Sequence, residues 1–172
     1  DLVVSGINHG SNTAINIIYS GTVSAAREAA IMDVTSIAIS VTNHAVKDFE
    51  FAGKVAKLIA LKVAGKELPR GTLLNVNVPD VPADQIAGII VTKQGKSKWD
   101  DTYEQRKDPY GRDYYWLTGN LMEVDTELDT DQAAVRNNYV SVTPIHFDLT
   151  DYETYEKMKN WNLERLINET TY

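Results

Sequence analysis

Short apolar runs alternate with helical patterns through the first ninety residues of the chain. Apolar positions at helical spacing predict helices over residues 23–32 and 51–63. Thr22 is the predicted N-cap of the first helix, and Asp48 and Gly65 bound the second. Four apolar runs are typical of strands buried in a parallel sheet: residues 2–4, 36–41, 72–78 and 88–92.

This alternation of strands and helices predicts an α/β fold, a Rossmann-like three-layer sandwich with a mostly parallel sheet. The first run is expected to be the inside of a buried strand that stops at Ser5-Gly6. Neither an internal repeat nor a low-complexity linker interrupts the chain, so residues 1–172 are predicted to form a single α/β domain.

The pattern changes after residue 95. Residues 96–120 are polar and aromatic, and the turn at residues 108–111 predicts a hairpin extension. Residues 139–145 alternate as a strand, in which Pro144 favours an edge position. Thr150 and Glu153 match a capping box, which predicts a C-terminal helical arm over residues 150–172.

Composition excludes several classes of function. The net charge of −7 argues against binding to a nucleic-acid duplex, and no apolar run reaches the length that spans a membrane. With no cysteine, the chain has no disulfide, no thiolate metal site and no cysteine nucleophile. These features favour a cytoplasmic location. Because the chain begins at Asp1 directly on a strand pattern, we expect a further N-terminal portion of the protein to precede it.

The candidate chemistry lies in two polar loops. Residues 5–12 (SGINHGSN) follow the first strand, where ligands bind in doubly wound sheets. Asn8 and Asn12 offer amide oxygens to a cation or amide donors to an anion. Residues 20–22 (Ser-Gly-Thr) open a helix, whose free amides and dipole attract phosphate. A nearby metal ion would supply the positive charge that these loops lack.

Common nucleotide-binding and hydrolase motifs are absent. The chain has no P-loop, no G-x-G-x-x-G dinucleotide fingerprint and no G-x-S-x-G elbow. His9 and His44 are interpreted as loop histidines, because no Ser-His-Asp order accompanies them. The aromatic residues Tyr114, Tyr115 and Trp116 fit hairpin packing or a subunit interface better than stacking on a nucleobase.

Four stretches together resemble the SurE family of metal-dependent nucleotidases: SGIN-x-G-x-N, IYSGTV-x-AA-x-E, LLNVNVPDVPADQIAGIIVT and TDQAAVRNNYVSVTPIHFDLT. The resemblance covers nearly the whole chain. It implies hydrolysis of nucleoside monophosphates to nucleoside and phosphate, with one divalent metal ion, Mg²⁺ or Mn²⁺. Further candidate substrates are 3′-nucleotides and polyphosphate. It implies Asn8 as a metal ligand, Asn12 and Ser20 as catalytic residues, and Ser20, Gly21 and Thr22 as the substrate-binding residues.

The resemblance also implies what this chain lacks. The family's paired Asp and a loop Ser fall before Asp1, so we expect the 172-residue chain alone to be inactive. The alternative is a non-catalytic phosphate- or nucleotide-binding module without the metal carboxylates. The hairpin and the C-terminal arm resemble the family's oligomerisation elements, which predicts a homodimer or homotetramer.

Overall fold

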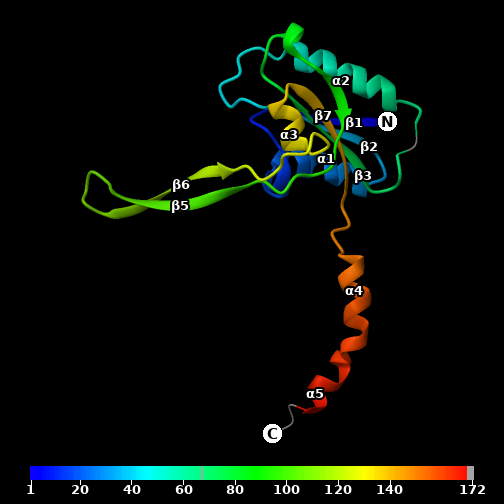
Figure 1. Cartoon of the computed structure of the whole chain (residues 1–172), viewed down its shortest axis with the longest axis vertical. Helices are drawn as coiled ribbons and strands as arrows, with labels where there is room; N and C mark the ends of the chain where they lie inside the picture. Colours follow the sequence, from blue (N-terminus) through cyan, green and yellow to red (C-terminus); the bar gives the residue numbers. More distant parts are fainter. Residues whose placement is uncertain (67, 170–172) are drawn as a thin grey trace.

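The computed structural model describes residues 1–66 and 68–169. Its centre is a five-stranded sheet in the order β1-β2-β3-β7-β4 (Figure 1). β1, β2 and β3 are mutually parallel, and β4 is parallel to β7, whereas β3 and β7 are antiparallel. The mostly parallel sheet predicted from the sequence is therefore confirmed. The strands are β1 (Leu2–His9), β2 (Thr35–Val41), β3 (Thr72–Val78), β4 (Gly88–Val91) and β7 (Tyr139–His146).

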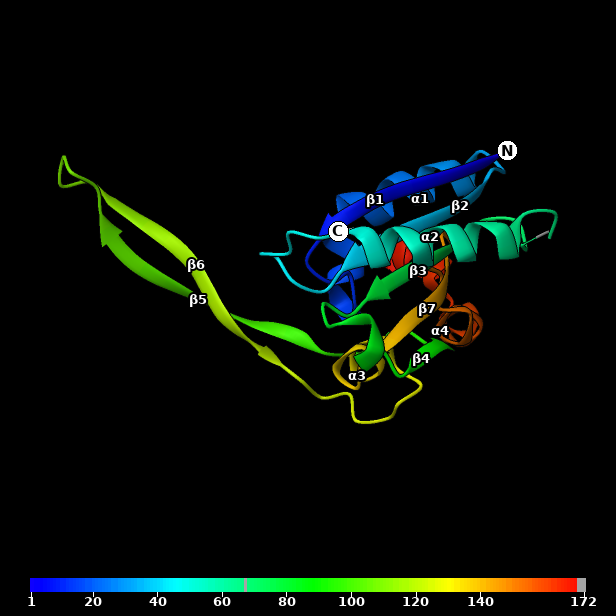
Figure 2. The same ribbon diagram turned by 90° about the horizontal axis from the view of Figure 1, so that it is seen from above.

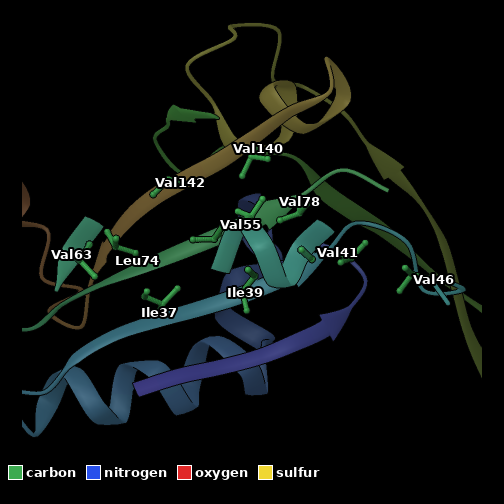
Figure 3. Packing of buried hydrophobic residues seen from close by; sticks show 12 residues of the cluster. Ile37, Ile39, Val41, Val46, Val55, Val63, Leu74, Val78, Val140 and Val142 are labelled. Atoms are coloured by element: carbon green, nitrogen blue, oxygen red, sulfur yellow. The ribbon is translucent and has the colours of Figure 1, made fainter. Parts of the chain in front are cut away.

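Helices α1 (Gly21–Ile31) and α2 (Glu50–Val63) cover opposite faces of the sheet, which gives three layers (Figure 2). Alternation along β2 explains this arrangement. Ile37 and Ile39 pack in the cluster that contains Val55 of α2 (Figure 3). Ala38, which points the other way, packs with Ala26 of α1. All five side chains are buried, so each face of β2 contributes to its own core.

β1 differs from its predicted form in two ways. It continues past Ser5-Gly6 to His9, because the polar residues that follow still pair with β2. It is also an edge strand, paired with β2 alone. Leu2, Val3 and Val4 are consequently 37%, 37% and 45% exposed, and the prediction that they are buried is wrong.

Pro144 tests the predicted position of the last strand. β7 lies between β3 and β4, so the prediction of an edge strand is wrong. However, β4 accompanies β7 only as far as Val142, and Pro144 lies opposite Leu74 of β3 with no strand on its other side. A residue without an N–H is tolerated at such a locally unpaired position.

Two of the predicted helix caps are shifted. Ser20, not Thr22, caps α1, since its Oγ accepts the N–H of Val23 at 3.1 Å. Asp151, not Thr150, caps α4 (Tyr152–Met158). In both cases the cap directly precedes the first helical residue, and its side chain accepts the N–H three positions further on, from Val23 and from Thr154.

The second helix matches its predicted bounds within one residue, although its N-cap is Phe49, which makes no side-chain cap hydrogen bond, and not Asp48. Asp48 accepts the N–H of Glu50 at 2.7 Å, just before the first turn of α2. Gly65 follows the helix with a φ of 74°. A positive φ is easiest for glycine, which explains why the helix ends there.

Two extensions leave the sheet domain in different directions (Figure 1). The first is a hairpin of β5 (Lys98–Lys107) and β6 (Asp113–Met122), in the region predicted as residues 96–120. The second is the C-terminal arm, which contains α4, η3 (Lys159–Trp161), η4 (Leu163–Arg165) and α5 (Leu166–Glu169). The predicted arm reached residue 172, and residues 170–172 lie outside the described part of the chain.

Three short elements complete the fold: η1 (Ala14–Tyr19) before α1, η2 (Ala83–Gln85) before β4, and α3 (Asp131–Arg136) before β7. Across the described ranges, no helix has the length and apolar character needed to cross a membrane.

Candidate functional site

Asn8 lies near the end of β1, and its side chain is fixed by the main chain. Its Nδ2 donates to the carbonyl oxygens of His9 and Gly10, at 3.0 and 2.9 Å. The amide oxygen of Asn8 therefore remains available to a cation or a donor. This oxygen is a single neutral group. In residues 1–66 and 68–169, no group of three or more His, Cys, Asp or Glu side chains is placed to hold a metal ion.

Gly10 forms the turn that follows Asn8. Its φ is 90°, and an added Cβ would lie 2.1 Å from the His44 ring. The turn therefore needs a glycine both for its backbone angle and for the space that His44 occupies. His9 packs edge-on against Phe49, with ring centroids 4.9 Å apart. Both histidines thus contact neighbouring loops of the sheet end.

Asn12 lies in a buried polar cluster. It is only 6% exposed, and its Nδ2 donates to Oγ of Ser40 at 2.6 Å. Its main-chain N–H donates to Oδ1 of Asn77 at 2.8 Å, and its carbonyl oxygen accepts from Nδ2 of Asn75 and of Asn77. Ser40, Asn75 and Asn77 are all fully buried. The structure thus places Asn12 against the sheet rather than in an open cleft.

Asp131 holds the next part of the same loop. Its carboxylate accepts the N–H groups of Ala14 and Gly95 at 2.9 Å and that of Gln132 at 2.7 Å. Ala14 has a φ of 51°, an uncommon angle for a residue with a Cβ. Burial raises the pKa of the Asp131 carboxyl, although these three amides act in the opposite direction. Asp131 therefore connects the loop to the base of the hairpin.

A second carboxylate, Asp125, lies beside it. It accepts from the amides of Lys96 and Ser97 and from the Ser97 hydroxyl. Burial alone would raise the pKa of Asp125, but the Ser97 hydroxyl and these amides outweigh it and hold the pKa below its ordinary value. The two carboxylates act here as anchors for the main chain at the hairpin base.

Residues 20–22 form the start of α1. Ser20 Oγ serves as the cap of the helix, and Gly21 has open space around its Cα. The first amides of an α-helix have no intrahelical acceptor, so those of Gly21 and Thr22 point out of the helix end. These groups suit an anion. In the described chain, no hydrogen bond joins Ser20, Gly21 or Thr22 to Asn8 or Asn12.

A cavity of about 440 Å³ opens next to the loop, at the carboxyl ends of β2 and β3. Ser11 forms part of its wall, together with Asn43, Asp80 and Arg136. Neither Asn8 nor Asn12 lines it. The cavity agrees with the position expected for ligands in doubly wound sheets.

Sequence reasoning missed the residues that hold this loop in place. Ser40, Asn75, Asn77 and Asp131 are buried, and each hydrogen-bonds to residues 12–14. One signal was present: in TLLNVNV, Asn75 and Asn77 lie two positions apart in a strand that is mostly apolar. Such alternation indicates that one face of a buried strand is polar.

Comparison with known proteins identifies the family. The family model for Survival protein SurE matches residues 1–101, more than half of the chain. The chain belongs to the SurE family. The 5′-nucleotidase SurE of Chlorobium limicola is 48% identical over 165 residues, which are 96% of this chain and 64% of that protein. The 5′-nucleotidase SurE of Natranaerobius thermophilus is 46% identical over 166 residues, with 95% and 64% covered.

A solved structure agrees with these matches. The SurE protein from Aquifex aeolicus superposes with a TM-score of 0.79 at 43% identity, and the alignment covers 94% of this chain and 65% of that one. The predicted family and the predicted α/β fold are therefore confirmed. The chain spans about 64% of the length of the curated SurE relatives that it matches.

Proposed function

We propose that this protein is a nucleotidase that hydrolyses nucleoside monophosphates to nucleoside and phosphate. The observation that carries the proposal is the opening of α1. Ser20, Gly21 and Thr22 present free amides and a hydroxyl at an eleven-residue helix, and the chain is 48% identical to a protein named 5′-nucleotidase. The α1 dipole and these donors would bind the phosphoryl group and stabilise charge on its oxygens during hydrolysis.

The roles of the loop residues follow from their contacts. Ser20 would donate its hydroxyl hydrogen to a phosphoryl oxygen, because Oγ already accepts from Val23 as the cap. Asn12 is 6% exposed and donates one Nδ2 hydrogen to Ser40, so its second Nδ2 hydrogen or its Oδ1 would fix the phosphoryl group or the attacking water. Asn8 would present its free amide oxygen at the end of β1.

Metal dependence is a separate part of the proposal. We expect one divalent ion, Mg²⁺ or Mn²⁺, with Asn8 as one of its ligands; such an ion supplies Lewis-acid polarisation of phosphoryl oxygens. Hard cations need carboxylates to neutralise them. The described residues contain no group of three or more His, Cys, Asp or Glu side chains placed to hold an ion, so by themselves they do not fit a complete divalent site. The roles assigned to Asn8, Asn12 and Ser20 therefore concern binding and orientation only.

The test is phosphate release from a panel of 5′- and 3′-nucleoside monophosphates and polyphosphate, using the protein expressed from its complete gene. We expect turnover of 5′-monophosphates that stops with a chelator and returns with Mg²⁺ or Mn²⁺. Asn8→Ala should raise the metal concentration needed for half-maximal activity. The metal role of Asn8 is wrong if the titration curve of that variant matches the wild type.

A non-catalytic phosphate- or nucleotide-binding module is the second candidate. The lack, in the described chain, of three or more acidic, His or Cys side chains placed to hold an ion favours it for these 172 residues taken alone. We expect the isolated 172-residue chain to release no phosphate while the complete protein does. Turnover by the isolated chain would contradict this expectation.

We also propose that the protein assembles as a homodimer or homotetramer through the hairpin and the C-terminal arm. Both extensions expose large apolar side chains, among them Tyr103 at 70%, Tyr115 at 65% and Trp161 at 60%. Exposed apolar surface on this scale is typical of an interface. The cytoplasmic location and the absence of duplex binding, both predicted from the sequence, remain part of this proposal.

A further inference from the structure

β3 carries two different faces near its carboxyl end. Leu74, Val76 and Val78 pack in the core cluster that includes α2. Asn75 and Asn77 point to the other face, and both are fully buried. Two buried asparagines in the middle of a sheet are costly to desolvate, so they need a structural or functional explanation.

The explanation is their contact with the loop after β1. Asn77 binds both main-chain polar groups of Asn12, accepting from its N–H at 2.8 Å and donating to its carbonyl oxygen at 3.1 Å. Asn75 donates to the same carbonyl oxygen at 2.8 Å. The main chain at Asn12 is thus held by three hydrogen bonds from residues more than sixty positions away in the sequence.

The side chain of Asn12 is held as well, because its Nδ2 donates to Ser40 Oγ on β2. We call Ser40, Asn75 and Asn77 the loop clamp. Asn75 Oδ1 is a buried polar atom that has no partner in the described chain. The one side-chain hydrogen bond of Asn75 in the described chain goes to the Asn12 carbonyl oxygen, so this buried residue is assigned to the loop.

We propose that the loop clamp consists of positioning residues for the phosphomonoester reaction. It fixes the main chain at Asn12, which lies between Asn8 near the end of β1 and Ser20 at the start of α1. The clamp thereby fixes the arrangement of these three residues. The clamp residues themselves do not contact substrate. This inference rests on the proposed function, because it assigns the clamp to that site.

The experiment uses the protein expressed from its complete gene, with three variants. Asn77→Ala removes two of the three hydrogen bonds to the Asn12 main chain, and Ser40→Ala removes only the contact to the Asn12 side chain. Val76→Ala is the matched control, because it truncates a fully buried side chain of the same strand on the opposite face. Three quantities are measured for each: the urea midpoint, kcat and KM for AMP, and amide hydrogen exchange of residues 10–19.

Asn77→Ala should lower kcat by about 10–100-fold with little change in KM. A loss of this size is typical of residues that orient a functional group by hydrogen-bonding to it. Amide exchange of residues 10–19 should accelerate. Ser40→Ala should give a smaller loss in the same direction, and its conservative shape keeps the test valid if Asn77→Ala does not fold. Val76→Ala should lose stability without a comparable loss of kcat in the folded fraction.

The proposal is overturned if Asn77→Ala and Ser40→Ala keep the wild-type kcat, or if Val76→Ala loses as much kcat as they do. Unchanged exchange at residues 10–19 in both clamp variants would also overturn it. If the wild-type protein releases no phosphate from any monoester, the proposed function fails instead. The exchange data then still decide whether the clamp fixes the loop.

Discussion

Gly95 lies between two buried carboxylates, and no backbone angle explains why it is a glycine. A Cβ added there would lie 2.5 Å from Asp125 Oδ2 and 2.9 Å from Asp131 Oδ1. Gly95→Ala should therefore lower the free energy of unfolding by about 1–3 kcal/mol, as overpacking does. Urea denaturation measures the change. Gly53→Ala is the control, since nothing lies within 4 Å of its Cβ position in α2, and alanine should stabilise that helix. Equal effects of the two substitutions would refute the steric explanation.

The cap of α1 gives a second prediction for single residues. Ser20→Ala removes the Oγ that accepts the Val23 N–H and should cost about 1 kcal/mol of stability. Thr22→Ala removes no hydrogen bond to the helix and should stay within about 0.5 kcal/mol of the wild type. Thermal unfolding of both variants distinguishes them. If Thr22→Ala lost more stability than Ser20→Ala, Thr22 would be the cap, as the sequence pattern predicted.

At the scale of elements, the Asp148 carboxylate accepts hydrogen bonds from Thr150 and Tyr152 in the turn that leads into α4. The Thr150 hydroxyl, then the Tyr152 hydroxyl and the Thr150 amide, lower the pKa of Asp148 from 3.8 to about 2. A lowered pKa in the folded state means that this carboxylate stabilises the turn above pH 3.8, and that the contribution disappears as pH falls towards 2. NMR signals of the Tyr152 ring should change across this range. In Asp148→Asn they should not, and an identical titration in both proteins would contradict the prediction.

Elements with a clear period were predictable from sequence, and those defined by distant partners were not. The helices α1 and α2 follow from apolar spacing, and β3 follows from TLLNVNV. The second half of β1 was missed, because residues 5–9 (SGINH) are mostly polar or glycine, and the strand state of Asn8 and His9 comes from pairing with β2. The antiparallel direction of β7 was also beyond local sequence, since it depends on the path taken by the chain after the hairpin.

The candidate site shows the same division. Asn8, Asn12 and Ser20 could be selected from one short stretch and its resemblance to the SurE family. The clamp could not, because Asn77 lies 65 residues from Asn12 and meets it only after β1 and β3 join one sheet. A polar residue on a buried strand indicates that its side chain has a hydrogen-bond partner, but only the folded structure identifies that partner.

At the scale of the whole molecule, the hairpin extends far from the sheet (Figure 2), and its strand register gathers several exposed apolar side chains on one of its faces. Cross-strand pairing places Tyr103 opposite Leu117, 70% and 56% exposed, on the same face as Trp99. The paired residues Thr102 and Thr118 lie on the other face. If the apolar face binds a second copy, each buried side chain contributes roughly 1.5–3 kcal/mol, so losing two weakens association by roughly 10²–10⁴-fold.

Tyr103→Ser combined with Leu117→Ser should therefore shift the protein towards monomer in sedimentation velocity at micromolar concentration. The matched control is Thr102→Ser combined with Thr118→Ser, which changes the opposite face and should keep the wild-type mass. A second variant lacks the C-terminal arm, residues 150–172. If the arm makes a contact of its own, this variant should also have a lower mass than the wild type, independently of the hairpin substitutions. An unchanged mass in the Tyr103/Leu117 variant would show that the hairpin face does not bind a second copy, because two central side chains of that face cannot be lost without weakening its association.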